Sequence, residues 1–167
     1  MKALSIKQPW AAVIAHGIKD VENRSRRTNY RGKILLHASA VPALREYQKP
    51  WDLFTIQQWR AIQDRHLQAW YINKAWCNGA IIGEAEIVGC VNNSSSIWAE
   101  PGQWHWQIAN ARIYTFDEIK TDVKGALGLW DFNQCGECSS YNACIFLKDI
   151  EKQTQACKEF TAKPSLL

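Results

Sequence analysis

The sequence of 167 residues lacks a hydrophobic run long enough to cross a membrane. Its longest apolar stretches, Trp10 to Ala15 and Ala80 to Gly83, fall far short of the roughly 20 residues that a spanning helix needs. The first residues, Met1 to Ser5, also lack the apolar core and the small-residue cleavage site of a secretory signal peptide. We therefore expect a cytoplasmic protein with no membrane partner.

The chain also lacks the two Cys-x-x-Cys knuckles that are typical of a zinc ribbon. One such knuckle and two further cysteines lie near the C-terminus: Cys135, Cys138, Cys144 and Cys157. A tetrahedral zinc on these four thiols is the alternative to reduced cysteines without a metal. We expect the reduced thiols, because disulfides belong mainly to secreted proteins, and we expect no cofactor.

Internal repeats, low-complexity tracts and linkers are absent as well, so we expect one domain over residues 1–167. A helical insertion is expected at about 42–76, and a cysteine-containing C-terminal extension at about 132–167. Apolar side chains in the insertion recur at steps of three and four, which predicts a helical stripe that faces the rest of the domain. The stripe consists of Ile56, Trp59, Ile62, His66 and Trp70.

What the chain does contain is a series of short strand patterns. The expected strands are 2–6, 18–25, 33–38, 80–91, 104–114 and 143–147. Proline is tolerated in a first helical turn, so Gln8-Pro9-Trp10 predicts the start of a short helix, which Gly17 ends. Gly83 and Gly89 interrupt the long strand and are expected to let it curl. The pattern predicts an α+β fold, a small mixed β-barrel with a short N-terminal helix and a helical insertion.

Positive charge is concentrated at the start of the chain. Residues 1–33 contain eight Lys or Arg and two acids, a net charge of +6, whereas the remainder has a net charge of −2. A basic segment on a slightly acidic body is typical of a surface that binds an anion such as RNA. A solvated charged edge is the alternative.

The order of several motifs resembles the ASCH family. The first half contains SIKQPWA (5–11), GIKDVENRS (17–25), RTNYRG (27–32) and LLHAS (35–39). The second half contains GEAEIVG (83–89), WHW (104–106) and GALGLW (125–130). The resemblance spans roughly residues 3–131. It implies a PUA-like barrel that binds RNA, a nucleotide or a modified nucleoside in a cleft.

One branch of this family is an amidohydrolase of acetylcytidine with the motif Gly-x-Lys-x-x-Thr-x-Arg, whose Lys and Thr act together with a separate Glu. Gly17, Lys19 and Arg24 match that motif, but Glu22 stands at the Thr position. With Glu in place of Thr, the chain lacks the hydroxyl nucleophile of that branch. The resemblance therefore favours binding over amide hydrolysis. If the protein is an enzyme, we expect Lys19 and Glu22 to be the catalytic pair.

Glu22 and Arg24 share one face of an extended strand, and Lys19 joins them only if the turn after Gly17 rotates it. Together they would supply a base and an anion clamp, and an ion pair that only stabilises the end of the barrel is the alternative. Lys7 and Gln8 are expected at the start of the first helix, where amide N–H groups favour an anion. The other expected ligand-binding residues are Trp10, Arg26, Arg27, Tyr30, Arg31, Ser39 and either Glu84 or Glu86.

Three functions are therefore candidates. The first is a monomeric module that binds RNA or a modified nucleotide without chemistry, with the arginines and Tyr30 contacting phosphates and bases. The second is a hydrolase of an acylated nucleoside or of RNA, which Lys19 and Glu22 within hydrogen-bond reach of each other would favour. The third is a protein-interaction module of transcription regulation, because ASCH domains also occur fused to coactivators.

Overall fold

The structure, a computed structural model, describes residues 1–43, 50–65 and 78–132. Its contacts divide the chain into two units, Met1–Asp131 and Phe132–Leu167, and every element below belongs to the first. The prediction of a single domain over 1–167 stays a prediction. The expected strand 143–147, His66, Trp70 and the four C-terminal cysteines lie outside the described residues.

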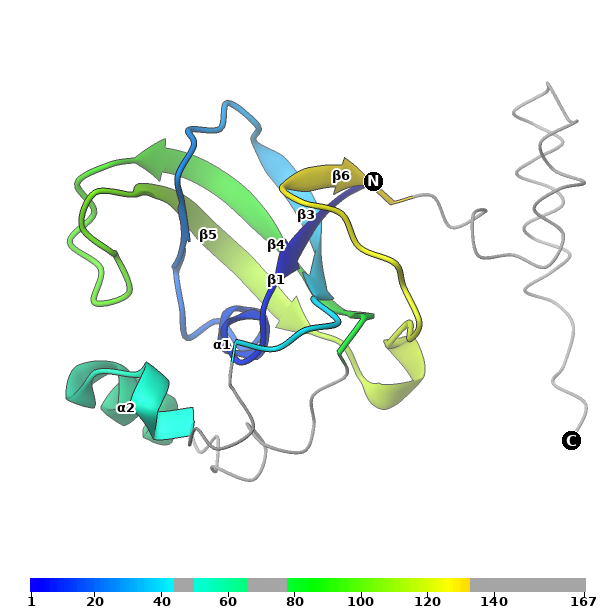
Figure 1. The fold of residues 1–167 in the computed structure, drawn as a ribbon, viewed down its shortest axis with the longest axis horizontal. Coiled ribbons are helices and arrows are strands. Elements are labelled where there is room, and N and C mark those ends of the chain that lie inside the picture. Colours follow the sequence, from blue (N-terminus) through cyan, green and yellow to red (C-terminus); the bar gives the residue numbers. More distant parts are fainter. Residues whose placement is uncertain (44–49, 66–77, 133–167) are drawn as a thin grey trace, which may run out of the picture. The chain divides into compact units, whose positions relative to one another are not determined.

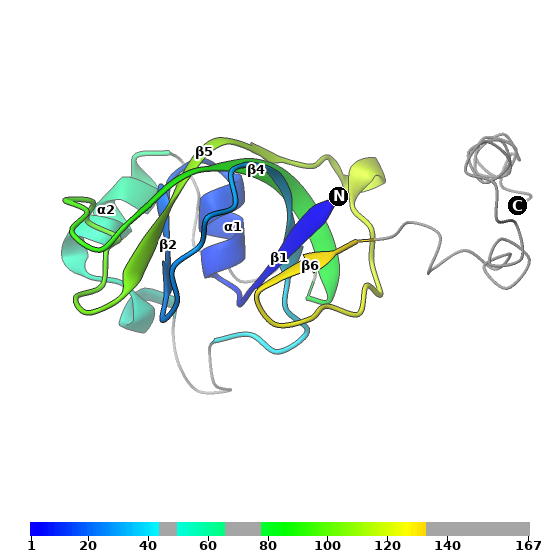
Figure 2. The same ribbon diagram turned by 90° about the horizontal axis from the view of Figure 1, so that it is seen from above.

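Six strands form one mixed sheet in the order β2-β5-β4-β3-β1-β6. The strands are β1 (Lys2–Ile6), β2 (Val21–Arg24), β3 (Gly32–Ala38), β4 (Ala80–Val91), β5 (Trp104–Ile113) and β6 (Leu129–Asp131). β1 and β3 are parallel, and the other neighbours are antiparallel. The sheet curls around helix α1 (Trp10–Ala15), with β2 and β5 on one side of it and β1 and β6 on the other (Figures 1 and 2). The expected α+β, barrel-like arrangement is confirmed at this level.

The curl is accompanied by irregular pairing of the long strand β4. Its register shifts near Gly83, opposite Leu36 and His37 of β3, and again between Ile87 and Gly89. A Cβ atom at Gly83 would lie 2.5 Å from the carbonyl oxygen of Arg112, so the backbone approaches too closely there for any side chain. These shifts confirm the prediction that Gly83 and Gly89 mark points of curling.

The main core fills the concave side of the sheet. Strand alternation sends Leu4, Ile34, Leu36 and Ile87 inward, where all four are fully buried. Helix α1 packs against them through Ala11, Ile14 and Ala15. At its start the Gln8 side-chain oxygen accepts a hydrogen bond from the amide of Ala12, and it ends as predicted at Gly17, whose φ is +70°.

The insertion contains a 3₁₀ turn, η1 (Pro50–Leu53), and helix α2 (Ile56–Gln63). Thr55 caps α2 through a capping box with Gln58, so the helix begins at Ile56. Ile62 and Trp59 pack into a second cluster with Phe54 and Trp98, as the predicted stripe requires. Ile56 was expected on this stripe and is instead 73% exposed, because the first helical residue after the cap points to solvent.

Two strand predictions need correction. The strand expected at 18–25 is limited to Val21–Arg24, since residues 18–20 lie between the turn that ends α1 and the first residue paired with β5. β6 was not expected as a strand, because three residues are too few for an alternating pattern to stand out. Lys2 of β1 forms an ion pair with Asp131 of β6 at 2.8 Å, and this hydrogen bond lowers the pKa of the Asp131 carboxyl.

The convex side of β1 and β3 carries a hydrogen-bonded group. His37 is 2% exposed, its Nε2 lies 3.0 Å from the carbonyl oxygen of Val123, and its Nδ1 lies 3.0 Å from Ser5 Oγ. A carbonyl can only accept, so Nε2 carries the proton and Ser5 donates to Nδ1. Ser5 Oγ in turn accepts a bond from Trp130 Nε1 at 3.0 Å. This group holds the segment that follows the 3₁₀ turn η2 (Phe116–Glu118) against the sheet.

None of the helices in the described ranges is both long and apolar enough to span a membrane.

Replacing Gly125 by alanine is expected to destabilise the fold. The new Cβ would lie 2.3 Å from Cε1 of His37, and that ring cannot move without breaking its two hydrogen bonds. Urea denaturation should show a loss of about 1–3 kcal/mol in the free energy of unfolding, the usual cost of overpacking. Lys124→Ala, at an exposed neighbouring position, is the control and should change it by less than about 0.5 kcal/mol. Equal stabilities of the two variants would contradict this packing.

Candidate functional site

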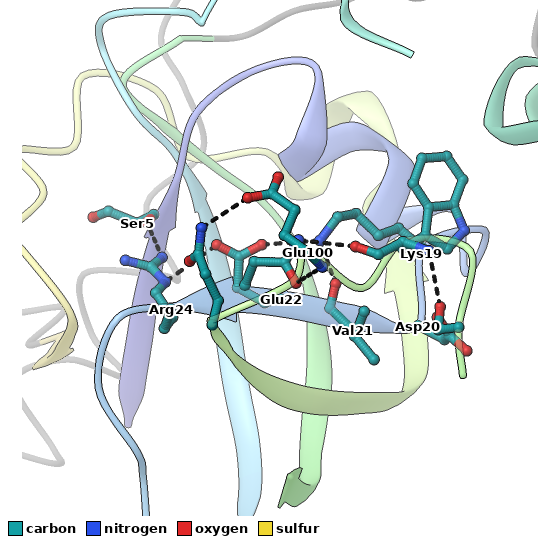
Figure 3. A network of polar contacts seen from close by, with 11 residues as sticks. Ser5, Lys19, Asp20, Val21, Glu22, Arg24 and Glu100 are labelled. Atoms are coloured by element: carbon teal, nitrogen blue, oxygen red, sulfur yellow. Dashed lines mark hydrogen bonds and ion pairs between the residues drawn. The ribbon is translucent and has the colours of Figure 1, made fainter. Parts of the chain in front are cut away.

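Lys19 is a buried cation, with a side chain 4% exposed. The amides of Ile18 and Lys19 both donate to the carbonyl of Val13, and this tight turn directs the lysine side chain toward β2. Nζ donates to the carbonyl oxygen of Val21 and lies 3.3 Å from Oε2 of Glu22 (Figure 3). The turn after Gly17 therefore brings Lys19 to Glu22, which strand parity alone would not do.

Glu22 lies on β2 opposite Trp106 of β5, and its side chain is 11% exposed. Oε1 lies 3.1 Å from Nε of Arg24, while Oε2 faces Lys19. Each carboxylate oxygen thus contacts a cation. Glu22 and Arg24 point the same way, as their spacing of two predicts.

Arg24 connects this ion cluster (Lys19, Glu22 and Arg24) to β1. Its Nη2 donates to the carbonyl oxygen of Ser5 at 2.7 Å (Figure 3), and its guanidinium lies 5.8 Å from the ring centroid of Trp106. Nε is close to Glu22 but makes no directed hydrogen bond, so that contact is one of charge. Nη1 has no hydrogen-bond acceptor among the described residues.

The ion cluster carries a net charge of one positive unit from two cations and one anion. Taking charges out of water is costly, and here the cost is offset by opposite charges within 3.3 Å and by hydrogen bonds to two backbone carbonyls. A partly buried cluster with excess positive charge and a spare guanidinium N–H is suited to holding an anion such as phosphate.

The loop 92–103 holds β2 from its outer side. Asn23 donates to the carbonyl of Trp98 and accepts from the amide of Glu100, and Asp20 accepts from the Ser96 hydroxyl (Figure 3). His105 ties the loop ends together, because its Nδ1 accepts from the amide of Ser94 and its Nε2 lies 2.9 Å from the carbonyl of Glu100. Sequence reasoning missed this support, since isolated polar residues in a loop carry no spacing signal.

The residues expected at the start of α1 lie in different surroundings. Gln8 is 1% exposed, and its amide oxygen is already bonded to the helix. The amide of Ala11 donates a hydrogen bond to the carbonyl of Lys7, and the Lys7 side chain is exposed. Trp10 packs edge-on against Phe54, with ring centroids 4.8 Å apart, so it belongs to the second cluster rather than to a stacking surface.

The basic loop after β2 remains exposed. The side chains of Arg26, Arg27 and Arg31 all face solvent. Arg31 folds back onto the carbonyls of Thr28 and Tyr30. Tyr30 packs against the main core and donates its hydroxyl to the carbonyl of Lys33, so its ring is largely committed to the fold. Ser39 is half-buried at the end of β3, where its amide donates to Ile6.

Glu84 and Glu86 have partners of their own: Glu86 accepts a hydrogen bond from Asn110, and Glu84 lies far along the sheet from the ion cluster. On β5, Arg112 lies opposite Glu84 whereas Trp106 lies opposite Glu22, a separation of six residues or about 20 Å along the strand. Glu84 forms an ion pair with Arg112 and accepts from the hydroxyl of Tyr114. Burial, followed by the charge of Glu84, raises the pKa of that tyrosine.

Within residues 1–43, 50–65 and 78–132, no group of three or more His, Cys, Asp or Glu side chains is placed to hold a metal ion. The four cysteines of the zinc alternative, Cys135, Cys138, Cys144 and Cys157, lie beyond these ranges, so that alternative stays untested.

A family model described as ASCH domain matches residues 4–161, nearly the whole chain. No curated protein matches the sequence.

Replacing Glu22 by glutamine should destabilise the protein strongly, because Lys19 and Arg24 would keep their charges without the carboxylate between them. Breaking a buried ion pair from one side costs about 3–5 kcal/mol. We expect a loss in this range in urea denaturation followed by circular dichroism. Adding Lys19→Met to Glu22→Gln should restore part of it, since one buried charge is then removed.

The exposed carboxylate of Glu100 gives the matched control, and Glu100→Gln should change the free energy of unfolding by less than about 0.5 kcal/mol. A Glu22→Gln variant as stable as this control would show that the carboxylate is not needed to balance the cluster.

Proposed function

The chain belongs to the ASCH domain family, and from this premise we propose that it binds RNA or a modified nucleotide at the ion cluster of Lys19, Glu22 and Arg24. One observation carries the proposal. Glu22 has a cation within 3.3 Å of each of its oxygens, so two cations and one anion lie together with one positive charge in excess. Such a cluster attracts an anion without needing to react with it.

The basic loop extends this positive charge beyond the cluster. Arg26, Arg27 and Arg31 follow β2 directly and are exposed, so phosphates on either side of a bound nucleotide could contact them. Phosphate contacts fix the position of a nucleic acid but do not read its sequence. We therefore propose low sequence specificity and strong dependence on salt.

The proposal includes two finer points that rest on the family resemblance. The curled sheet around α1 is taken as a PUA-like barrel, and the protein is taken to act as a monomer. The amide donors and carbonyl acceptors of a modified base would have to be matched by groups near the cluster, and the free Nη1 of Arg24 is one such donor.

Hydrolysis is the second candidate, because Lys19 and Glu22 lie within hydrogen-bond reach of each other. A lysine acts as a base only when it has lost its proton. Here Nζ of Lys19 is already engaged by Glu22 and by the carbonyl of Val21, which works against that role. The same ammonium could still stabilise a developing oxyanion in a reaction that uses another base.

Reversing two charges in the basic loop, with Arg26→Glu and Arg27→Glu together, should weaken the binding of single-stranded RNA and flatten its salt dependence. Each phosphate contact contributes about −0.7 to the slope of log affinity against log salt, so losing two contacts should reduce the slope by about 1.4. Fluorescence anisotropy with a labelled oligonucleotide at several salt concentrations measures both quantities.

The control is a second double variant, Arg60→Glu with Arg65→Glu, which changes the net charge of the protein by the same amount. Both positions are exposed, and they lie on helix α2 and just after it rather than in the basic loop. This control should leave the slope nearly unchanged. If both double variants lose affinity to the same extent, only the net charge matters and the basic loop has no special role.

Lys19→Met tests binding against hydrolysis. Acylated nucleosides and short RNAs should be bound but not converted by the wild-type protein, as followed by mass spectrometry over many hours. If the wild type converts one of them and Lys19→Met does not, while circular dichroism shows that the variant is folded, the hydrolase candidate replaces the binding proposal.

A further inference from the structure

Trp104 is a half-buried aromatic residue at the edge of the ion cluster. It lies on β5 directly opposite Arg24 and two residues from Trp106, which lies opposite Glu22. Residues two apart on a strand share a face, so both tryptophans lie on the same side of β5 as the ion cluster. Part of the Trp104 ring packs against the main core, and part of it is accessible.

An exposed arginine lies over the ring of Trp104. The guanidinium of Arg27 lies 5.8 Å from the ring centroid of Trp104. Arg27 is exposed, and it makes no hydrogen bond or ion pair within the described ranges. A cation–π contact at an exposed site is weaker than the stacking of a base on an aromatic ring, so a base can take this place with a net gain.

The neighbouring aromatic residues are already committed to the fold. Trp106 is 6% exposed and donates its Nε1 to the carbonyl of Arg26. The hydroxyl of Tyr30 is bonded to Lys33, and Trp10 packs edge-on against Phe54 and Trp98. The indole N–H of Trp104, in contrast, has no acceptor among the described residues.

We propose that the accessible face of Trp104 stacks an unpaired base of a single-stranded nucleic acid. Arg27 then moves to the other face of the base, and Nη1 of Arg24 reaches the adjoining phosphate. This inference rests on the proposed function and adds to it the place of the base and the requirement that the strand be unpaired.

The requirement for a single strand follows from the chemistry of stacking. Bases in an A-form duplex are stacked on one another, and the deep, narrow major groove keeps side chains from their edges. A ring attached to a sheet surface can contact only a base that has left such a stack. Every base has an aromatic face, so the subsite would accept purines and pyrimidines alike.

The test compares two probes of equal length, an eight-residue oligoadenylate and the same ribose-phosphate chain without bases, both titrated into the full chain. In the wild type, the oligoadenylate should bind at least tenfold more tightly than the abasic chain. Trp104→Leu should lose roughly tenfold in affinity for the oligoadenylate and nothing for the abasic chain. Trp104→Phe should retain most of the affinity, because a smaller aromatic ring still stacks.

Trp59→Leu, at a half-buried tryptophan on α2, is the matched control and should bind both probes as the wild type does. Circular dichroism checks the fold of each variant, and Trp104→Phe keeps the test decisive if Trp104→Leu does not fold. An RNA duplex is titrated into the wild type as a third probe. Equal losses of Trp104→Leu for the oligoadenylate and the abasic chain, or tighter wild-type binding of the duplex than of the oligoadenylate, would overturn the subsite and leave the proposed function standing. Failure of the wild type to bind either probe would overturn both.

Discussion

The carboxylate of Glu22, held between Lys19 and Arg24, is the interaction on which the open side of the curled sheet depends. β1 and β2 are not neighbours in the sheet, and β6 pairs with β1 only as far as Leu4. The carbonyl of Ser5 therefore lies beyond the β6 ladder, and Arg24 binds it. By orienting Arg24, Glu22 links β2 to β1 where no strand pairing does so, and it fixes the cations that a ligand would meet.

The sequence was sufficient to predict most of the sheet because the strands are long enough to alternate. Strands at 2–6, 33–38 and 80–91 were predicted with bounds that agree within one residue with β1, β3 and β4. β6 was missed because its position depends on pairing with residues far away along the chain. Ile56 was placed on the wrong side because helical periodicity sets which residues share a face but does not fix where the helix begins.

The site was predictable in part for similar reasons. Glu22 and Arg24 are two residues apart on a strand, so the sequence predicts that their side chains lie on the same face. The contact of Lys19 with Glu22 depends on the turn after Gly17, which no periodic pattern describes. The position of Glu84 far from this group follows from the register of β4 against β5, which a sequence pattern does not specify. Polar support from Asn23 and His105 depends on the path of the loop 92–103, so it becomes visible only in three dimensions.

The position of β1 within the sheet also has a consequence for how the protein folds. Lys2 of β1 pairs with Asp131 of β6 at a separation of 129 positions, and β2 pairs with β5 across about eighty. Such contacts give a high contact order, because a long loop must close before the pairing stabilises it. The antiparallel pair β4 and β5 is much more local and can form first. We therefore expect the edge that joins Lys19, Glu22 and Arg24 to β1 to assemble late, when the first strand pairs with the last.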